Sequence, residues 1–260
     1  MTIRTFGRDL WLSWAGIVAI LLLWQVVVTL ELVNPAIFPG PLRVVRDALT
    51  LVSADDLLQH VWRSLLRIIQ GFLIGGSLGV LIGVTAGWYR WVGSAVRTPI
   101  ELLRPIPPLA WIPLALIWFG LGESSKIFII ALGAFFPVVT NTYKGMIGVD
   151  PDLLRAAQTL GVRGWRLLPQ VALPAALPDI AIGVRVGWSL SFGALVAAEI
   201  LAASQGLGFL IMNARELGQI GIIIYGIILI GILNLITDYL IREFIFKRQL
   251  KWHFGGMQTE

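Results

Sequence analysis

The sequence predicts an all-α membrane protein with six membrane-spanning helices and both ends on the cytoplasmic side. Of its 260 residues, 57% are hydrophobic and only 13% are charged, whereas a soluble domain has about 25% charged residues. The mean hydropathy is +0.83. The apolar residues gather in long blocks, and about 20 of them suffice for one helical crossing of the hydrocarbon. We therefore expect a single membrane domain.

The composition also excludes several kinds of site. Cysteine is absent, which rules out disulfides, thioether-linked haem and thiolate metal ligands. The two histidines, His60 and His253, are far apart in sequence, so no metal site is expected. The net charge of +5 does not indicate a nucleic-acid partner, because the basic residues gather near the ends of the apolar blocks, as membrane topology requires.

The apolar blocks set the expected boundaries. We expect a cytoplasmic N-terminus over residues 1–10, one transmembrane domain over 11–246 and a cytoplasmic tail over 247–260. The first block is not followed by a small-residue cleavage site, which indicates a retained span. The spans are expected at about 11–30, 60–88, 96–121, 127–147, 175–203 and 219–246, with a loop over 148–174.

The segments between the spans have their own signals. Prolines and a glycine over 34–41 end the first helix, and 42–52 has the apolar spacing of a helix lying on the membrane surface. We expect 123–126 to be a tight polar turn and 204–218 a polar loop. Asp55 and Asp56 are the candidate caps of the second span.

The second span contains glycines at four-residue spacing, at positions 75, 79 and 83. Such small-xxx-small pairs let a neighbouring helix approach closely, so we interpret them as a packing face. Arg63 and Arg67 lie one helical turn apart near the start of this span. We expect both side chains to extend to the membrane interface rather than to bind substrate.

The third block is interrupted by Pro105, Pro107, Pro108 and Pro113. These prolines break or bend a helix and free carbonyl groups. Broken backbone at membrane depth is tolerated only where it is buried in protein or lines a cavity. We therefore interpret residues 104–113 as the candidate translocation path or gate; the alternative is a kinked helix with a packing role alone. Glu101 and Arg104 are three residues apart, a spacing that lets them neutralise each other.

Positive charge indicates the orientation. A cytoplasmic N-terminus puts twelve basic residues inside and six outside. The inner set is Arg4, Arg8, Arg90, Arg97, Lys144, Arg155, Arg163, Arg166, Arg242, Lys247, Arg248 and Lys251, and the outer set is Arg43, Arg46, Arg63, Arg67, Lys126 and Arg215.

The loop between the fourth and fifth spans contains a helix with clear start and stop signals. Asp150 is a good N-cap, Pro151 suits the first helical position and Gly161 suits the left-handed residue after the helix end. The loop also contains the basic residues Arg155, Arg163 and Arg166. We expect this helix to dock against another protein; the alternative is an ordinary amphipathic loop helix. The apolar residues available for docking are Leu153, Leu154, Leu160, Trp165 and Leu167.

This loop resembles the cytoplasmic coupling motif of binding-protein-dependent ABC importer permeases, which is Glu-Ala-Ala, three residues, Gly, nine residues and Ile-x-Leu-Pro. Ala156 and Ala157 match the paired alanines and Gly161 matches the glycine. After nine residues, Val171 stands for the isoleucine, and Leu173 with Pro174 ends the motif. Arg155 replaces the glutamate, so a salt bridge formed by that glutamate is not carried over.

The resemblance extends over nearly the whole chain and points to the nitrate/sulfonate/taurine branch, with the taurine and aliphatic sulfonate permeases most similar. The matching segments are Phe38-Pro39-x-Pro41, Leu103 to Leu114, Ile117 to Lys126, Ala197 to Ala203, Gly206 to Phe209 and Met212 to Glu216.

The resemblance implies a type I importer in the inner membrane of a bacterium. Two copies of the chain would pair, bind two cytoplasmic ATP-binding subunits and receive a small anion from a periplasmic or lipid-anchored binding protein. The chain has no G-x-x-x-x-G-K-[ST] loop, so ATP and Mg²⁺ are expected in the partner ATPase and no cofactor or catalytic residue in this chain. The expected ATPase-coupling residues are Asp150, Pro151, Leu154, Arg155, Ala156, Ala157, Gly161, Arg163, Leu173 and Pro174.

A small anion needs donors or positive charge along its path, and ionisable residues inside a membrane are functional candidates by default. For Arg185, a role in the path and a structural pairing with Asp179 or Glu199 are equally compatible with the sequence. For Glu199 we favour a structural role. The candidate path residues are Arg104, Pro105, Pro107, Pro108, Trp111, Arg185, Trp188, Ser189, Ser191 and Glu199.

A rival class is a self-sufficient secondary transporter that uses an ion gradient, for which Asp179, Glu199 and Asp238 are the available carboxylates in the later spans. A membrane-embedded enzyme lacks the clustered groups for chemistry. The sequence leaves the substrate open between taurine, another sulfonate, nitrate and bicarbonate.

Overall fold

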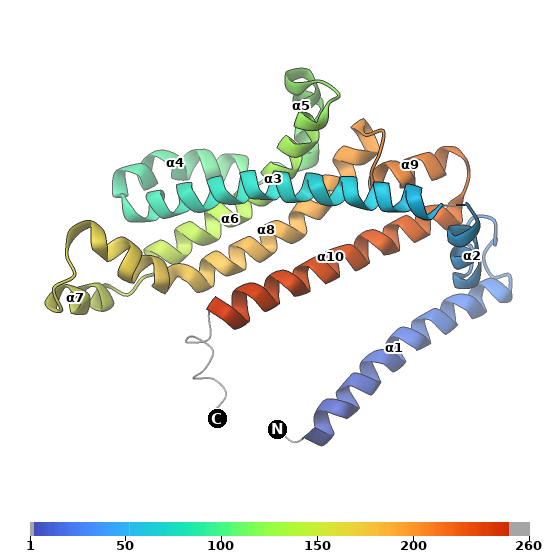
Figure 1. The fold of residues 1–260 in the computed structure, drawn as a ribbon, viewed down its shortest axis with the longest axis horizontal. Helices are drawn as coiled ribbons and strands as arrows, with labels where there is room; N and C mark the ends of the chain where they lie inside the picture. Colours follow the sequence, from blue (N-terminus) through green and yellow to red (C-terminus); the bar gives the residue numbers. More distant parts are fainter. Residues whose placement is uncertain (1–2, 52, 250–260) are drawn as a thin grey trace.

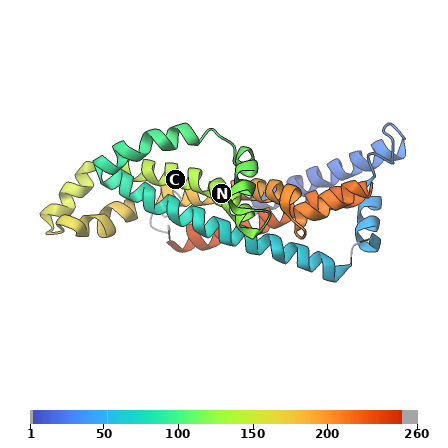
Figure 2. The same cartoon turned by 90° about the horizontal axis from the view of Figure 1, so that it is seen from above.

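The computed structural model describes residues 3–51 and 53–249, and this part of the chain is helical with no strand. Long helices run along one axis of an elongated molecule, with α7 at one end and α2 and α9 at the other (Figures 1 and 2). The elements are α1 (Ile3–Thr29), α2 (Pro41–Leu51), α3 (Ala54–Trp88), α4 (Arg90–Leu103), η1 (Pro108–Trp111), α5 (Ile112–Phe119), α6 (Glu123–Ile147), α7 (Pro151–Thr159), η2 (Gly164–Arg166), η3 (Leu168–Ala172), α8 (Leu173–Ala202), α9 (Leu207–Glu216) and α10 (Ile220–Gln249).

Four helical segments of the described chain are long and apolar enough to cross a membrane: Asp56–Trp88, Glu123–Ile147, Gly164–Ala202 and Ile220–Glu243. A fifth span results if Arg90–Leu103 and Pro108–Phe119 count as one, although the two are bent by 90° at the break. In the first expected span, Ala15–Thr29 is a shorter apolar helix. The lengths therefore support four or five spans, and the count of six stays a prediction, as does the cytoplasmic position of both ends.

α6 is the central helix, with α3 on one side and α8 on the other. The α3 contact is built on glycine, as the four-residue spacing predicts. A Cβ at Gly79 would lie 2.9 Å from Cβ of Val138, and one at Gly83 would lie 2.6 Å from Cβ of Thr142. The stripe is longer than expected, because Gly71 and Gly87 approach Ile130 and Met146 of α6 in the same way.

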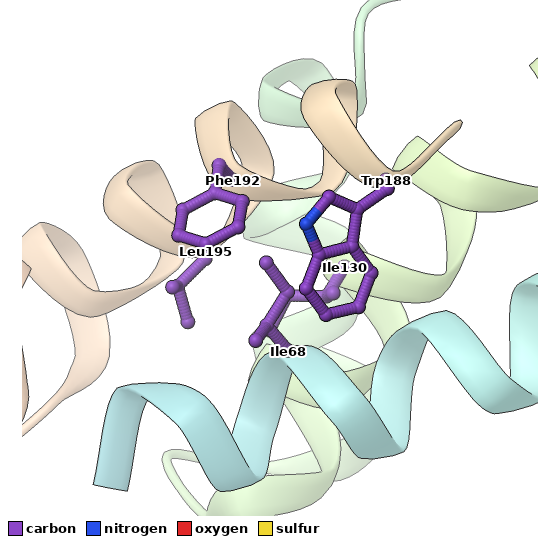
Figure 3. Packing of buried hydrophobic residues seen from close by; sticks show 5 residues of the cluster. All are labelled: Ile68, Ile130, Trp188, Phe192 and Leu195. Carbon is purple, nitrogen blue, oxygen red and sulfur yellow. The ribbon is translucent and has the colours of Figure 1, made fainter. Parts of the chain in front are cut away.

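The main core cluster lies where α3, α6 and α8 meet (Figure 3). Trp188 and Phe192 of α8 pack there with Ile68 of α3 and Ile130 of α6. The Trp188 ring also meets the ring of Phe72 edge-on, with centroids 5.0 Å apart. This cluster holds the three central helices together.

Three expectations about connecting segments are wrong. Residues 123–126 form the first turn of α6 instead of a separate turn, and residues 207–216 form helix α9 inside the expected polar loop. Ser53 caps α3 instead of an aspartate: its Oγ accepts a hydrogen bond from the Asp56 N–H at 3.2 Å and donates one to Asp56 Oδ2 at 2.6 Å. A serine at this position is a favoured N-cap, because its hydroxyl satisfies one of the free N–H groups of the first turn.

Candidate functional site

Helix α7 has the caps that its sequence predicts. At its start, Oδ1 of Asp150 accepts a hydrogen bond from the Asp152 N–H at 2.8 Å, and Pro151 is the first helical residue. At its end, Gly161 has φ +94°. The Val162 N–H reaches the Ala157 carbonyl at 3.0 Å, while the Gly161 N–H reaches Gln158 at 3.1 Å. These two bonds are a Schellman motif, so α7 is a short helix fixed at both ends.

One side of α7 is anchored to the bundle. Leu154 packs against a cluster that contains Met146 from the end of α6, Ala172 from the end of η3, and Ala176 and Ile180 from the first part of α8. Leu173 contacts the same cluster, and Leu173 and Pro174 begin α8 after the π-helical turn of η3. Leu154 therefore connects α7 to the end of α6 and to the beginning of α8.

The opposite side of α7 and the segment after it are exposed. Leu160 is 85% exposed and Trp165 is 76% exposed, and Leu153 is exposed as well. Arg155 donates to Oδ1 of Asp152 at 2.8 Å, on a surface where both side chains are exposed. Ala156 and Arg163 are also exposed. Large exposed apolar side chains at one end of the molecule are a candidate contact surface for another protein.

The break between α4 and η1 borders a cavity of about 350 Å³. Arg104, Pro107 and Pro108 of the expected path line it, together with Thr140 and Asn141 of α6 and further residues of α6 and α8. Pro105 lies in the break but does not line this cavity, and Trp111 packs with the apolar cluster of Ile112 and Ala115. The proline-rich segment thus borders a cavity, as broken backbone at membrane depth requires.

The path candidates on α8 do not line the described cavities. Trp188 belongs to the core, and its indole N–H donates to Oγ1 of Thr237 at 2.9 Å. Ser191 is buried and donates to the Gly187 carbonyl at 2.8 Å, whereas Ser189 is exposed. Arg185 binds Asp238 of α10 through two hydrogen bonds of 2.8 Å, so the expected pairing with Asp179 or Glu199 is wrong.

Glu199 is fully buried in a charge network that joins four helices. Arg67 of α3 donates to Oε1 of Glu199 at 2.7 Å and also binds both carboxylate oxygens of Glu123, at 2.6 and 2.8 Å. Lys126 adds a contact of 3.0 Å to Glu123. The expectation that Arg67 extends to the membrane interface is therefore wrong, since its side chain is buried; Arg63 is exposed.

The same network holds the start of α9. The Leu207 N–H donates to Oγ of Ser64 at 2.9 Å, the Gly208 N–H to Oε2 of Glu199 at 2.9 Å, and the Gly206 N–H to Nδ1 of His60 at 3.0 Å. These are the N–H groups that a helix start leaves without intrahelical partners, and a carboxylate there also suits the helix dipole. Two of these partners, His60 and Ser64, were missed from the sequence, although both share one face of α3 with Arg67 by their spacing.

The other charges near the break are arranged differently from the expected pairing. Glu101 binds Arg97 at 2.8 Å, one helical turn earlier, instead of Arg104. Among the described residues, Arg104 has no hydrogen bond or ion pair through its guanidinium. No group of three His, Asp or Glu residues in the described chain could hold a metal ion. The arrangement offers a positive charge beside a cavity.

Within the described chain, four or five apolar helical segments long enough to cross a membrane are typical of a multi-pass membrane protein. The chain belongs to the family described as binding-protein-dependent transport system inner membrane component, whose model matches residues 78–248. It is thus an inner-membrane permease of the ABC importer class, in the branch that the sequence resemblance indicates.

Individual relatives support this assignment. The chain is 37% identical to the putative aliphatic sulfonates transport permease protein SsuC of Bacillus subtilis, over 90% of this chain and 84% of the relative. It is 36% identical to the taurine transport system permease protein TauC of Escherichia coli, over 95% and 91%. A solved structure of the inward-facing MetNI methionine ABC transporter has a TM-score of 0.51 at 21% identity, covering 74% of this chain and 98% of that one, which supports the fold.

Proposed function

We propose that the chain is the membrane subunit of an ATP-driven importer for a small anion, taurine or another sulfonate. The named activities of the relatives SsuC and TauC support the substrate class. The exposed Arg104 beside the 350 Å³ cavity supports an anion, because it is a positive charge without a protein partner in the described chain. Two copies of the chain would enclose the path, and a binding protein outside the membrane would deliver the substrate.

The observation that carries the proposal is the exposed, doubly capped helix α7. Its position matches the coupling motif of importer permeases, and its apolar residues Leu160 and Trp165 face water. In the assembled importer this surface would dock on one of two cytoplasmic ATP-binding subunits. Those subunits would bind ATP and Mg²⁺ and hydrolyse the nucleotide, while this chain binds neither.

The packing supports a mechanical route from α7 to the cavity. Leu154 ties α7 to the beginning of α8, and α8 supplies Leu190 and Gly193 to the cavity wall further along the same helix. Closure of the ATPase dimer would move α7, and the continuous helix α8 would transmit that movement to the broken segment. Such coupling needs one element that both sites bias, and the α7–α8 unit meets this requirement.

A secondary transporter driven by an ion gradient would need a carboxylate free to take up and release a proton or cation. Glu199 and Asp238 both form ion pairs with arginines, at 2.7 and 2.8 Å. Asp179 is exposed and does not line the cavity of about 350 Å³ at the break between α4 and η1, called the central cavity below. These observations favour the importer.

The test is reconstitution of the chain with its cognate ATPase and binding protein in liposomes. We expect uptake of radiolabelled taurine or ethanesulfonate that requires ATP inside, the binding protein outside and all three components together. Nitrate and bicarbonate are the comparison substrates. The proposal fails if no ATP-binding subunit co-purifies with the chain and uptake persists after ATP depletion.

A further inference from the structure

A second polar groove lies between α4 and α6, towards the end of the molecule that contains α7. Its volume is about 260 Å³. Arg97, Glu101 and Arg104 line it from α4 and the residue after it, and Tyr143 and Lys144 line it from α6. Four of its twelve lining residues are charged, and charged side chains are costly in hydrocarbon. This groove therefore faces water or another protein surface rather than lipid tails.

The charges of the groove leave two cations unpaired. Arg97 binds Glu101 at 2.8 Å, so the single carboxylate in the lining is already neutralised. Lys144 and Arg104 have no hydrogen bond or ion pair through their side chains within the described chain. An anion that enters the groove thus meets two free positive charges, one from each wall.

The groove continues the central cavity. Arg104 and Thr140 line both spaces. On α6 the shared wall follows one helical stripe through Gly133, Pro137, Thr140 and Lys144. At about 1.5 Å per residue this stripe is roughly 16 Å long, and it leads from the broken segment towards the α7 end. The Thr140 Oγ1 donates to the Phe136 carbonyl at 2.8 Å, so the path-facing hydroxyl is fixed in orientation.

We propose that the α4–α6 groove is an inner holding site for the oxyanion head of the transported molecule, with Lys144 as its principal ligand. Arg104 serves both spaces and passes the head group from the central cavity to Lys144. This inference rests on the proposed importer function and adds a site on the inner side of the break. The same chemistry would suit the phosphate of an anionic lipid, so the experiment separates the two sources.

The natural absence of cysteine makes a single engineered thiol specific. We choose K144C in the complete complex with its ATPase and binding protein, and R90C as the matched control. Arg90 is an exposed basic residue at the start of α4 that does not line the groove. Ethanesulfonate at millimolar concentration should slow modification of the K144C thiol by a methanethiosulfonate reagent several-fold, and leave R90C unaffected.

Uptake gives a second readout. K144C should reduce ethanesulfonate or taurine uptake about tenfold, as expected for the loss of one charge-assisted hydrogen bond. Modification with aminoethyl methanethiosulfonate restores an ammonium group and should restore uptake, whereas the sulfonatoethyl reagent should not. If K144C does not assemble, T140C, in the wall common to both spaces, is tested for protection in the same way.

The inference is overturned if K144C transports like the unaltered complex and ethanesulfonate gives no protection. It is also overturned if protection depends on phosphatidylglycerol and disappears in phosphatidylcholine alone, since the groove would then hold a lipid head group. Failure of the importer function would be seen separately, because the unaltered complex would then show no ATP-dependent uptake of the anion. The protection assay does not depend on transport, so its result for K144C stands apart from that outcome.

Discussion

Arg67 donates to Glu199 at 2.7 Å with both side chains buried, 4% and 0% exposed. The two residues are 132 positions apart, and their pairing connects α3 to the end of α8. Ser64 also donates to this carboxylate, at 2.8 and 2.9 Å. The Glu199 carboxylate therefore accepts bonds from Arg67, Ser64 and the Gly208 N–H, and such pairing is the condition under which a buried charge is tolerated.

Breaking this pair from one side should destabilise the protein strongly. R67M leaves the Glu199 carboxylate buried without its cation, a change that costs about 3–5 kcal/mol for buried pairs. We expect a large drop in the melting temperature of the detergent-solubilised chain, measured by size-exclusion chromatography after heating. The double variant R67M/E199L should be more stable than the sum of the single changes predicts, because no unpaired charge remains.

The control is R97Q, which removes an ion pair between exposed side chains and should change the melting temperature little. Equal effects of R67M and R97Q would contradict the structural role of the buried network.

Gly206 is required by the same network. Its backbone has φ +129° and ψ 171°, a region that is almost exclusive to glycine, and a Cβ there would lie 2.5 Å from the Glu199 carboxyl carbon. G206A should therefore separate α9 from Glu199 and lower stability by more than the roughly 1–3 kcal/mol of backbone strain alone. Protease accessibility of α9 reports the separation. G231A, where a Cβ would meet no atom within 4 Å, should leave α9 protected; similar digestion of both variants would argue against this account.

Adjacent glycines in α3 allow a sharper test of helix packing. A Cβ at Gly75 would collide with the backbone carbonyl of Ala131 in α6, whereas one at Gly76 would meet only the Phe72 ring at 3.6 Å. G75A should thus force α3 and α6 apart and reduce the yield of folded chain, because the backbone cannot move away as a side chain does. G76A should be neutral or slightly stabilising through better helix propensity. The folded fraction of each variant after solubilisation is the measurement, and reversed results would contradict the α3–α6 contact.

The features predicted correctly from the sequence depend on local spacing. The caps of α7 at Asp150 and Gly161, and the glycine face of α3, follow from residues within one or two helical turns, where conformational preference and spacing act directly. The break at Pro105 to Pro108 is local as well. For the candidate site, these local signals gave α7 and the lining residues Arg104, Pro107 and Pro108.

Three of the wrong predictions depend on distant parts of the chain. Arg185 had two candidate carboxylates nearby in sequence, yet it binds Asp238 on α10, 53 residues away. Arg67 was assigned to the membrane interface, yet it binds Glu199 on α8, 132 residues away. Helix α9 was missed because its start is capped by His60, Ser64 and Glu199 from other helices, so that no local N-cap signal was needed. Tertiary packing decided these cases, and spacing along the chain does not encode it.

The last prediction separates shape from charge in α7. Arg155 stands where the importer motif has glutamate, and it is exposed and binds only Asp152 within its own helix. If the caps and the apolar surface provide the docking, R155E should still co-purify with the ATP-binding subunit and retain most of the ATP-dependent uptake.

The shape of α7 is tested by three other variants. W165S and L160S remove the most exposed apolar side chains of this surface and should weaken the association. G161V should disrupt the helix end, since φ +94° is strained for a branched residue. For all four variants, the measurement is the amount of ATP-binding subunit that co-purifies with the chain. The control is that each variant still inserts into the membrane. Loss of the ATPase in R155E alone, with W165S and L160S unaffected, would mean that charge at position 155 and not the capped shape governs docking.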